Sequence, residues 1–259
     1  FLMGPLLVGV FELVNSNTVA DISVRGKPSG IGCGKPPKDD GGSSGGTPWI
    51  VYGESTDKFA LCIGISNYDG KRNDLNYCDD DAMAWKDFLV AKGWQVLVLL
   101  DTAATADNME LALIELDNLE SSGSMVAVTY SGHGVWYDNT YKSCWLSTDM
   151  VYVTNGWVDM MMDNLEAGQQ FIFTDACESG AFEDGLRQNG RIATSGAQGA
   201  GTYTYDAFEY RMGAFTYFAL ENAPVSAEQA SDDACVGFNA WLGANQAEWS
   251  DGVSGEFVF

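Results

Sequence analysis

A chain of 259 residues with 46% hydrophobic residues can bury a substantial core, so disorder throughout is excluded and one large domain, or a domain with an appendage, is expected. With 36 acidic and 13 basic residues the formal charge is −23, which disfavours nucleic acid and anionic membranes as partners and suits basic substrates or divalent cations. Solubility, for example in a salty habitat, is the simpler account of the total charge, so only acids placed in a site carry functional weight.

The first 48 residues are predicted to lie outside the compact domain. Residues 1–26 contain two apolar, strand-like stretches, 6–14 and 19–24, and we interpret them as an N-terminal strand segment. The apolar start is too short for a membrane span, so we expect this segment to dock on a sheet or on a neighbouring subunit and to support self-assembly. Residues 27–48 are rich in Gly, Pro and Ser and are predicted to be a linker.

The cysteines and the start of the chain bear on the cellular location of the protein. The start at Phe1 rather than Met, the acidity and the six cysteines favour an extracellular or cell-surface protein, with the cytoplasm as the alternative. No two cysteines form a CxxC pair, and a single histidine argues against a Cys/His zinc site. Cys62 lies in an apolar stretch and is interpreted as a buried thiol, while pairing among the cysteines at 33, 78, 144 and 235 stays open.

Residues 49–259 are predicted to form the compact domain, in which strands and helices alternate. Short apolar runs predict strands at 59–65, 95–100, 125–130, 170–174 and 191–195, with 255–259 as a candidate for the last strand. Helices are predicted at 79–92, 105–119, 155–165 and 211–221. This alternation indicates an α/β fold with a parallel sheet covered by helices on both faces.

Two motifs place a histidine and a cysteine after two of these strands. The only histidine, His133, follows the strand at 125–130, and Cys177 follows the strand at 170–174. Parallel sheets place their chemistry at the carboxyl ends of strands, so the two side chains can face one cleft. A thiol nucleophile needs such an imidazole to manage protons, and the amides of Gly134 and Cys177 are candidate oxyanion donors. A histidine in a structural turn and a core thiol are the alternatives.

These motifs resemble the two signatures of caspase-like cysteine peptidases, the metacaspase branch in particular. The resemblance rests on Ser131-Gly132-His133-Gly134 and on Asp175-Ala176-Cys177-Glu178-Ser179-Gly180, and segments 59–68, 74–82 and 213–217 support it. It covers residues 58 to 222. It implies a caspase-like sandwich, with a mostly parallel six-stranded sheet and helices on both faces, and the activity of a cysteine endopeptidase.

The resemblance also implies roles for individual residues. Cys177 matches the family's nucleophile and His133 its partner in a dyad. Asp81, Ser131 and Asp175 match the acidic pocket with which metacaspases select Arg or Lys, so basic peptides or proteins are the expected substrates. A helix N-terminal acid is the alternative for Asp81, and a turn residue that caps local amides is the alternative for Asp175. True caspases place arginines in this pocket, and these motifs contain none.

No cofactor is implied for the chemistry, but calcium activates many metacaspases. Asp184 matches one family ligand, and Asp159 and Asp163 are the nearest candidates for others, with a solvated helix face as their alternative. Arg187 and Arg191 are candidate points of self-cleavage, because an acidic pocket would accept them.

Two other functions remain open at this level. The first is a caspase-fold scaffold or assembly protein that uses its N-terminal strand for subunit contacts. The second is a legumain-like or gingipain-like peptidase of the same fold with a different pocket.

Overall fold

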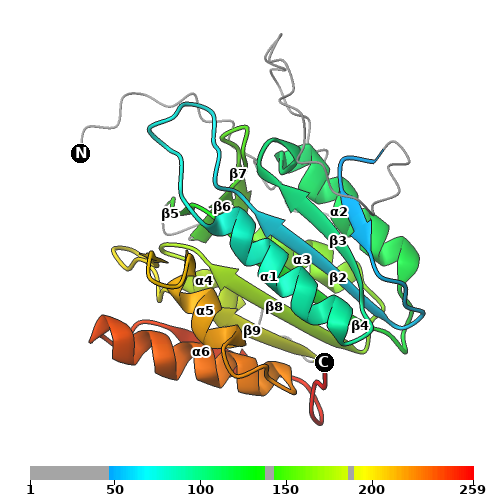
Figure 1. The fold of residues 1–259 in the computed structure, drawn as a ribbon. Coiled ribbons are helices and arrows are strands. Elements are labelled where there is room, and N and C mark those ends of the chain that lie inside the picture. Colours follow the sequence, from blue (N-terminus) through cyan, green and yellow to red (C-terminus); the bar gives the residue numbers. More distant parts are fainter. Residues whose placement is uncertain (1–46, 138–142, 186–189) are drawn as a thin grey trace.

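The computed structural model describes residues 47–137, 143–185 and 190–259 of the chain. They form three layers, with a central sheet between two layers of helices (Figure 1). The predicted strand segment 1–26, nearly all of the linker 27–48, and Arg187 lie outside the described residues.

The described residues build a central sheet of seven strands in the order β1-β3-β2-β4-β8-β9-β12. Its five inner strands run parallel, and they are β3 (Gln95–Leu100), β2 (Lys58–Gly64), β4 (Met125–Ser131), β8 (Gln169–Asp175) and β9 (Arg191–Ser195). The edge strands β1 (Ile50–Tyr52) and β12 (Glu248–Asp251) pair antiparallel with their neighbours. The sheet is therefore mostly parallel, as predicted, with one strand more than the six expected.

The prediction of a last strand at 255–259 is wrong. Only Val258 in this stretch forms an isolated bridge, to Ser226. Phe257 and Phe259 are buried in the core instead, where Phe257 stacks on Trp94 at a centroid distance of 6.0 Å. The aromatic side chains that suggested a strand thus serve as packing for an irregular segment.

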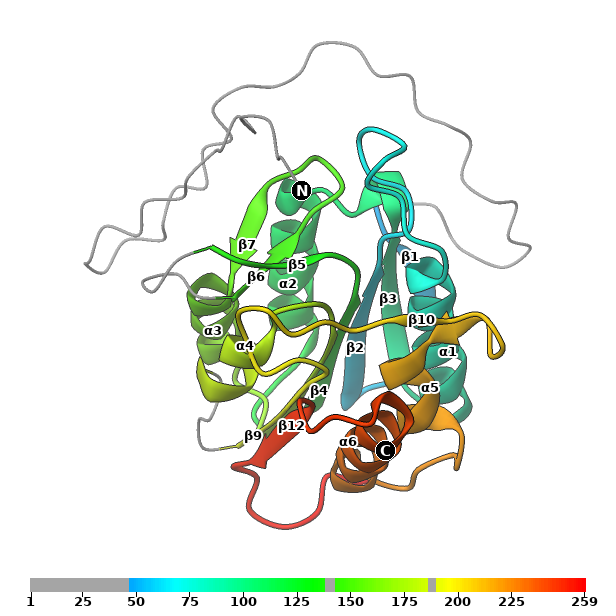
Figure 2. The ribbon, with the colours of Figure 1, turned by 90° about the vertical axis from the view of Figure 1, so that its left-hand side faces the viewer.

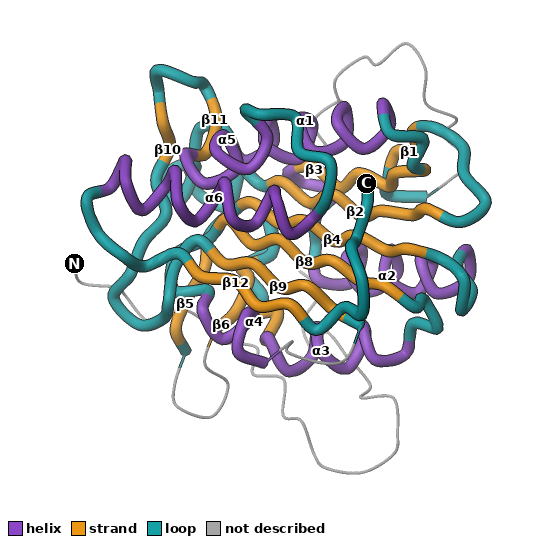
Figure 3. Tube along the Cα trace, turned by 90° about the horizontal axis from the view of Figure 1, so that it is seen from below, coloured by secondary structure: helices purple, strands orange, loops and turns teal. Residues whose placement is uncertain are grey.

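Helices cover both faces of the sheet, as the view from below in Figure 3 shows. One layer contains α1 (Cys78–Ala91), α5 (Ala214–Leu220) and α6 (Ala227–Leu242), and the other contains α2 (Ala106–Leu119), α3 (Asn155–Asn164) and α4 (Gly180–Gly185). A short 3₁₀ helix, η1 (Asp101–Ala103), joins β3 to α2. Among the described residues, no helix combines the length and the apolar character needed to cross a bilayer.

Three helices differ from the prediction, and α4 and α6 are the two that were not predicted. α5 begins at Ala214 rather than near 211, because β10 (Asp206–Ala207) and β11 (Met212–Gly213) form a hairpin just before it. α6 was not predicted, since its buried face consists mainly of alanines. Its start nevertheless carries a signal: the Ser226 hydroxyl accepts a bond from the amide of Gln229 at 3.3 Å, the Ser-x-x-Gln pattern of a capping box.

A small antiparallel sheet extends from the carboxyl end of β4. It consists of β5 (Gly134–Trp136), β6 (Ser143–Leu146) and β7 (Tyr152–Thr154). Trp145 of β6 stacks between Tyr130 of β4 and Phe182 of α4, at centroid distances of 4.6 and 4.7 Å. This aromatic stack fixes the small sheet against the large one.

The register of the parallel strands decides what meets at the sheet's edge. Gly64 pairs with Ser131, and Ser131 pairs with Asp175, so β2, β4 and β8 end level. His133 and Cys177 each lie two residues beyond a paired strand end. Figure 2 shows the small sheet and the loop after β2 at this same end of the molecule.

We predict that Trp145→Ala lowers the free energy of unfolding by roughly 3–5 kcal/mol, because it removes a fully buried aromatic side chain from between two stacked rings. Chemical denaturation of the variant and the wild type measures this. Val236→Ala, at a position 62% exposed on α6, is the control and should change stability by less than about 0.5 kcal/mol. Equal stability of Trp145→Ala and the wild type would contradict the role of the stack.

Candidate active site

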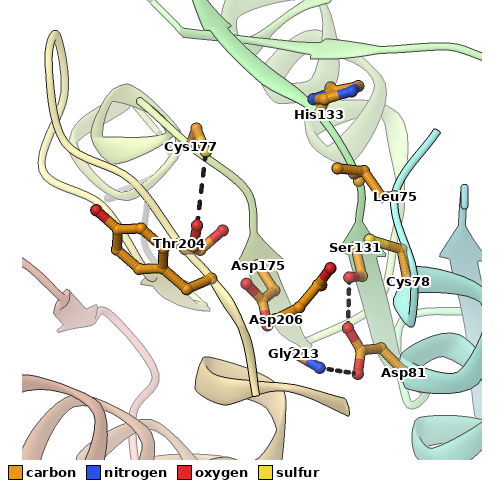
Figure 4. Close-up of a pocket in the computed structure, with 12 residues that line it drawn as sticks. Leu75, Cys78, Asp81, Ser131, His133, Asp175, Cys177, Thr204, Asp206 and Gly213 are labelled. Atoms are coloured by element: carbon orange, nitrogen blue, oxygen red, sulfur yellow. Dashed lines mark hydrogen bonds between the residues drawn. The ribbon is translucent and has the colours of Figure 1, made fainter. Parts of the chain in front are cut away.

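A pocket of about 200 Å³ opens at the carboxyl ends of β4 and β8. His133 and Cys177 stand on either side of its mouth, and acidic residues lie deeper (Figure 4). The cleft that the two sequence motifs predict is therefore present. Its remaining lining comes from the loop before α1 and from the segment around β10 and β11.

His133 is held by its neighbours in one orientation. Its Nε2 lies 2.7 Å from the carbonyl oxygen of Asn73, and its backbone amide donates to the Tyr68 hydroxyl at 2.7 Å. A carbonyl only accepts hydrogen bonds, so Nε2 carries the proton and the neutral ring keeps its lone pair on Nδ1. Burial lowers the pKa of His133, which favours this neutral form at pH 7.

Cys177 follows β8 and is the only described cysteine that is not fully buried. Its Sγ donates to the carbonyl oxygen of Thr204 at 3.8 Å. Burial raises the pKa of the thiol, so it rests in the neutral form. The resting site is thus a neutral thiol opposite a neutral imidazole, each hydrogen-bonded to a backbone carbonyl.

Gly134 packs directly on the backbone of Cys177. A Cβ atom at Gly134 would lie 1.8 Å from the Cys177 carbonyl oxygen, so only glycine fits there. The two residues whose amides were predicted as oxyanion donors are therefore in contact.

Glu178 fastens the loop opposite His133, residues 196–205. Its carboxylate accepts from the amide of Trp136 at 2.6 Å and from the amide of Gly201 at 2.8 Å. Its own amide donates to Thr202, and its backbone is left-handed with φ of 54°. Glu178 thereby joins β5, the cysteine turn and the loop that carries Thr204.

The three residues of the predicted acidic pocket meet below the mouth. Asp81 is fully buried and accepts from the Ser131 hydroxyl at 2.6 Å and from the Gly213 amide at 2.8 Å. Asp175 accepts from the amide and the hydroxyl of Thr216 at 3.0 and 2.9 Å. Neither carboxylate forms an ion pair within the described residues. The pocket therefore holds two buried carboxyl groups that have hydrogen bonds but no counter-charge among the described residues.

Burial raises the pKa of both acids. It raises the pKa of Asp175 to about 6, against the lowering effect of the hydrogen bonds from Thr216. The pKa of Asp81 is raised well above its usual value, first by burial and then by the charge of Asp175. An organic cation in the pocket would relieve both effects, which makes the arrangement suited to a guanidinium or ammonium group.

Sequence reasoning missed several residues of the pocket. Asp206 of β10 adds a third carboxylate, which accepts a hydrogen bond from the side-chain amide of Asn76 at 2.9 Å. Cys78 and Leu75 also line the pocket. Gly213 lies between the acids: a Cβ there would be 2.5 Å from Asp175 Oδ2 and 2.6 Å from Asp81 Oδ2. Gly213 could have been found from the sequence, because it begins the 213–217 segment that supports the family resemblance. Asp206 lies in a stretch with no recognisable pattern.

Two of the three carboxylates proposed as calcium ligands contact an arginine. Arg191 is buried, and its guanidinium donates to Asp159 at 2.7 Å and also to Asp163. The described residues contain no group of three or more His, Cys, Asp or Glu side chains that could hold a metal. Asp184 lies in α4, but its side chain is outside the described part of the structure. Asp159 and Asp163 therefore share one positive charge, that of Arg191.

The same burial corrects the reading of Arg191 as a cleavage point. Arg191 opens β9, which pairs with β8 and β12 inside the central sheet. Its peptide bonds are not accessible to a protease in the folded chain.

Comparisons with known proteins agree with this geometry. A family model described as the caspase domain matches residues 57–237, most of the chain. Metacaspase-4 and metacaspase-6 of Arabidopsis thaliana are each 30% identical over 149 residues, which are 51% of this chain but 35% and 40% of those proteins. The chain thus spans less than half the length of these curated relatives. A crystal structure of a Geobacter sulfurreducens protein shares the fold, with a TM-score of 0.60 at 18% identity over 77% of this chain and 94% of that one.

We predict that Gly213→Ala weakens binding of benzamidine, a small amidinium compound, at least about tenfold, because the added methyl group enters the space between the two carboxylates. Isothermal titration calorimetry measures the affinity. Gly123→Ala is the matched control, since a Cβ at Gly123 meets nothing within 4 Å. Unchanged affinity in Gly213→Ala would show that the cation does not bind between these acids.

Proposed function

The chain belongs to the caspase domain family, and from that premise we propose that it is a cysteine endopeptidase that hydrolyses peptide bonds after Arg or Lys. One observation carries the proposal: a single pocket has a thiol and an imidazole at its mouth and three carboxylates below them. The groups proposed to cleave the peptide bond and those proposed to select the substrate therefore lie in one cleft.

The acids argue for a basic residue before the scissile bond. A guanidinium offers several donors in a planar fork, which suits carboxylates that approach from two sides, and it supplies the positive charge that the pocket lacks. An acidic side chain would add a fourth carboxyl group near Asp81, Asp175 and Asp206. The preference of true caspases for Asp is therefore not expected.

The resting protonation states define the chemical steps. The thiol proton of Cys177 passes to Nδ1 of His133 while the sulfur forms a bond to the scissile carbonyl carbon. The amides of Gly134 and Cys177 hold the negative oxygen of the tetrahedral intermediate. His133 then gives the proton to the leaving amine as the C–N bond breaks, and water hydrolyses the acyl-enzyme to regenerate the thiol.

Calcium has no step in this proposal. The resemblance to metacaspases implies calcium as an activator, but Asp159 and Asp163 are ion-paired with Arg191. Assays with and without calcium therefore test activation separately from the chemistry.

We predict that the full chain cleaves fluorogenic peptides that present Arg or Lys before the bond and leaves the matching Asp peptide intact. Cys177→Ala should reduce the rate to background, because the nucleophile is removed. Cys235→Ala, a change of a buried thiol in α6, is the matched control and should retain activity. A folded wild-type chain that cleaves no basic peptide, with or without calcium, would favour the scaffold function instead.

We also predict that the advantage of an Arg peptide over its neutral citrulline counterpart falls as the pH drops through about 6. Below that pH Asp175 is protonated and no longer attracts the guanidinium, whereas both peptides share any effect of His133. The ratio of the two kcat/KM values from pH 4.5 to 8.5 measures this.

Asp175→Asn provides the variant for this experiment. It should lower kcat/KM for the Arg peptide by about 10- to 150-fold at pH 7.5, the range expected for a lost charge-assisted hydrogen bond, and should remove the fall of the ratio that is centred near pH 6. A ratio that stays constant across pH 6 in the wild type would contradict the role given to Asp175.

A further inference from the structure

The loop between β2 and α1 carries the only two adjacent basic residues of the whole sequence, Lys71 and Arg72. Both are exposed. Neither forms an ion pair with another described residue. In a chain of formal charge −23, a pair of adjacent unpaired cations is an unusual local feature.

The pair directly precedes Asn73, the residue whose backbone binds the imidazole of His133. Asn73 accepts the Nε2 hydrogen of His133 on its carbonyl oxygen at 2.7 Å. The turn is closed by two bonds from Asn73, from its amide to Gly70 at 2.9 Å and from its side chain to Asp69 at 3.1 Å. Lys71 and Arg72 lie inside this turn, so the backbone of the pair is fixed directly before the residue that binds His133.

The loop is anchored on both sides of the pair. Tyr68 precedes the pair, and its hydroxyl accepts a hydrogen bond from the backbone amide of His133. The Tyr68 and His133 rings pack together with their centroids 4.7 Å apart. Leu75, after it, lines the pocket, and Asp74 accepts a bond from the Tyr68 amide at 3.2 Å. Asp74 thus points a carboxylate oxygen inward to the backbone. Asp69 is the other acid of the turn and is exposed.

The two kinds of charge lie on different sides of the reacting groups. The carboxylates of Asp81, Asp175 and Asp206 line the pocket below the mouth, where the residue before the scissile bond binds. In the proposed reaction His133 protonates the leaving amine, so the peptide that leaves begins on the side of His133. The loop with Lys71 and Arg72 is attached to that same side.

We propose that Lys71 and Arg72 form a subsite for acidic residues that follow the scissile bond, so that the preferred substrate has Arg or Lys before the cut and Asp or Glu after it. This inference rests on the proposed function. Most of the surface repels an acidic segment, and these two cations offset that repulsion where the leaving peptide passes. The pair selects substrates and takes no part in the bond chemistry.

Internally quenched peptides with Arg before the bond and with Asp-Asp, Ala-Ala or Lys-Lys after it test the subsite. We expect the wild type to cleave the Asp-Asp peptide about three- to tenfold more efficiently than the Lys-Lys peptide, the range for two exposed charge pairs, and expect the ratio to shrink at high salt. Lys71→Glu with Arg72→Glu should remove or reverse the ratio. The same double variant should cleave an Arg-aminocoumarin amide, which has no residue after the bond, at the wild-type rate.

The double variant Lys58→Glu with Lys92→Glu is the control. It changes the net charge equally, and its positions at the start of β2 and just after α1 lie away from the pocket. It should keep the wild-type ratio. Intact mass of each protein after the assay verifies that the loop itself is uncut.

The possible outcomes distinguish failure of the subsite from failure of the proposed peptidase function. Equal Asp-Asp to Lys-Lys ratios in the wild type and in Lys71→Glu with Arg72→Glu would overturn the subsite while the cleavage after Arg stands. Failure of the wild type to cleave any of these substrates, the aminocoumarin amide included, would overturn the proposed function and the subsite together.

Discussion

The arrangement of the pocket depends on two carboxylates that are buried without a counter-charge. Moving Asp81 and Asp175 out of water and close to each other is unfavourable, and it is the reason that their pKa values are raised. Hydrogen bonds from Ser131, Gly213 and Thr216 offset part of that cost. The remainder is an attraction for a cation, and the described residues place no cationic side chain against these two acids.

These two acids also connect the layers of the fold. Asp81 comes from α1, Asp175 from the end of β8, and their donors come from β4, β11 and α5. Because Gly213 has no side chain, β11 can pass within contact distance of both carboxylates. The pocket is thus assembled from both the sheet and the helical layer that covers it, and its shape depends on how these layers pack.

Much of this could be read from the sequence because the relevant signals are local. Apolar runs located four of the five parallel strands, and the register of those strands then carried His133 and Cys177 to the same edge. β1 has only three residues, too few to show a pattern. α6 has an alanine-rich buried face, so its capping residues were a better guide than its hydrophobicity.

Other features could not be predicted because they depend on contacts between distant segments. Asp159 and Asp163 have the chemistry of calcium ligands, and only the fold reveals that Arg191 lies against them. Asp206 enters the pocket because the β10–β11 hairpin brings it there. The sequence alone does not indicate which cation a given carboxylate will contact in the fold.

The two loops at the mouth link specificity to chemistry. The loop before α1 holds the imidazole through Asn73, and the loop before β10 holds the thiol through Thr204. One hydrogen bond, from Asn76 to Asp206, joins the two loops across the pocket. Asp206 lies two residues after Thr204, and its partner Asn76 lies three residues after Asn73, so the third carboxylate is bonded to the same two segments that position the thiol and the imidazole. Occupancy of the pocket and the geometry of the thiol and imidazole are then set by one connected network, which is why the acids and the reacting groups are best understood as a single site.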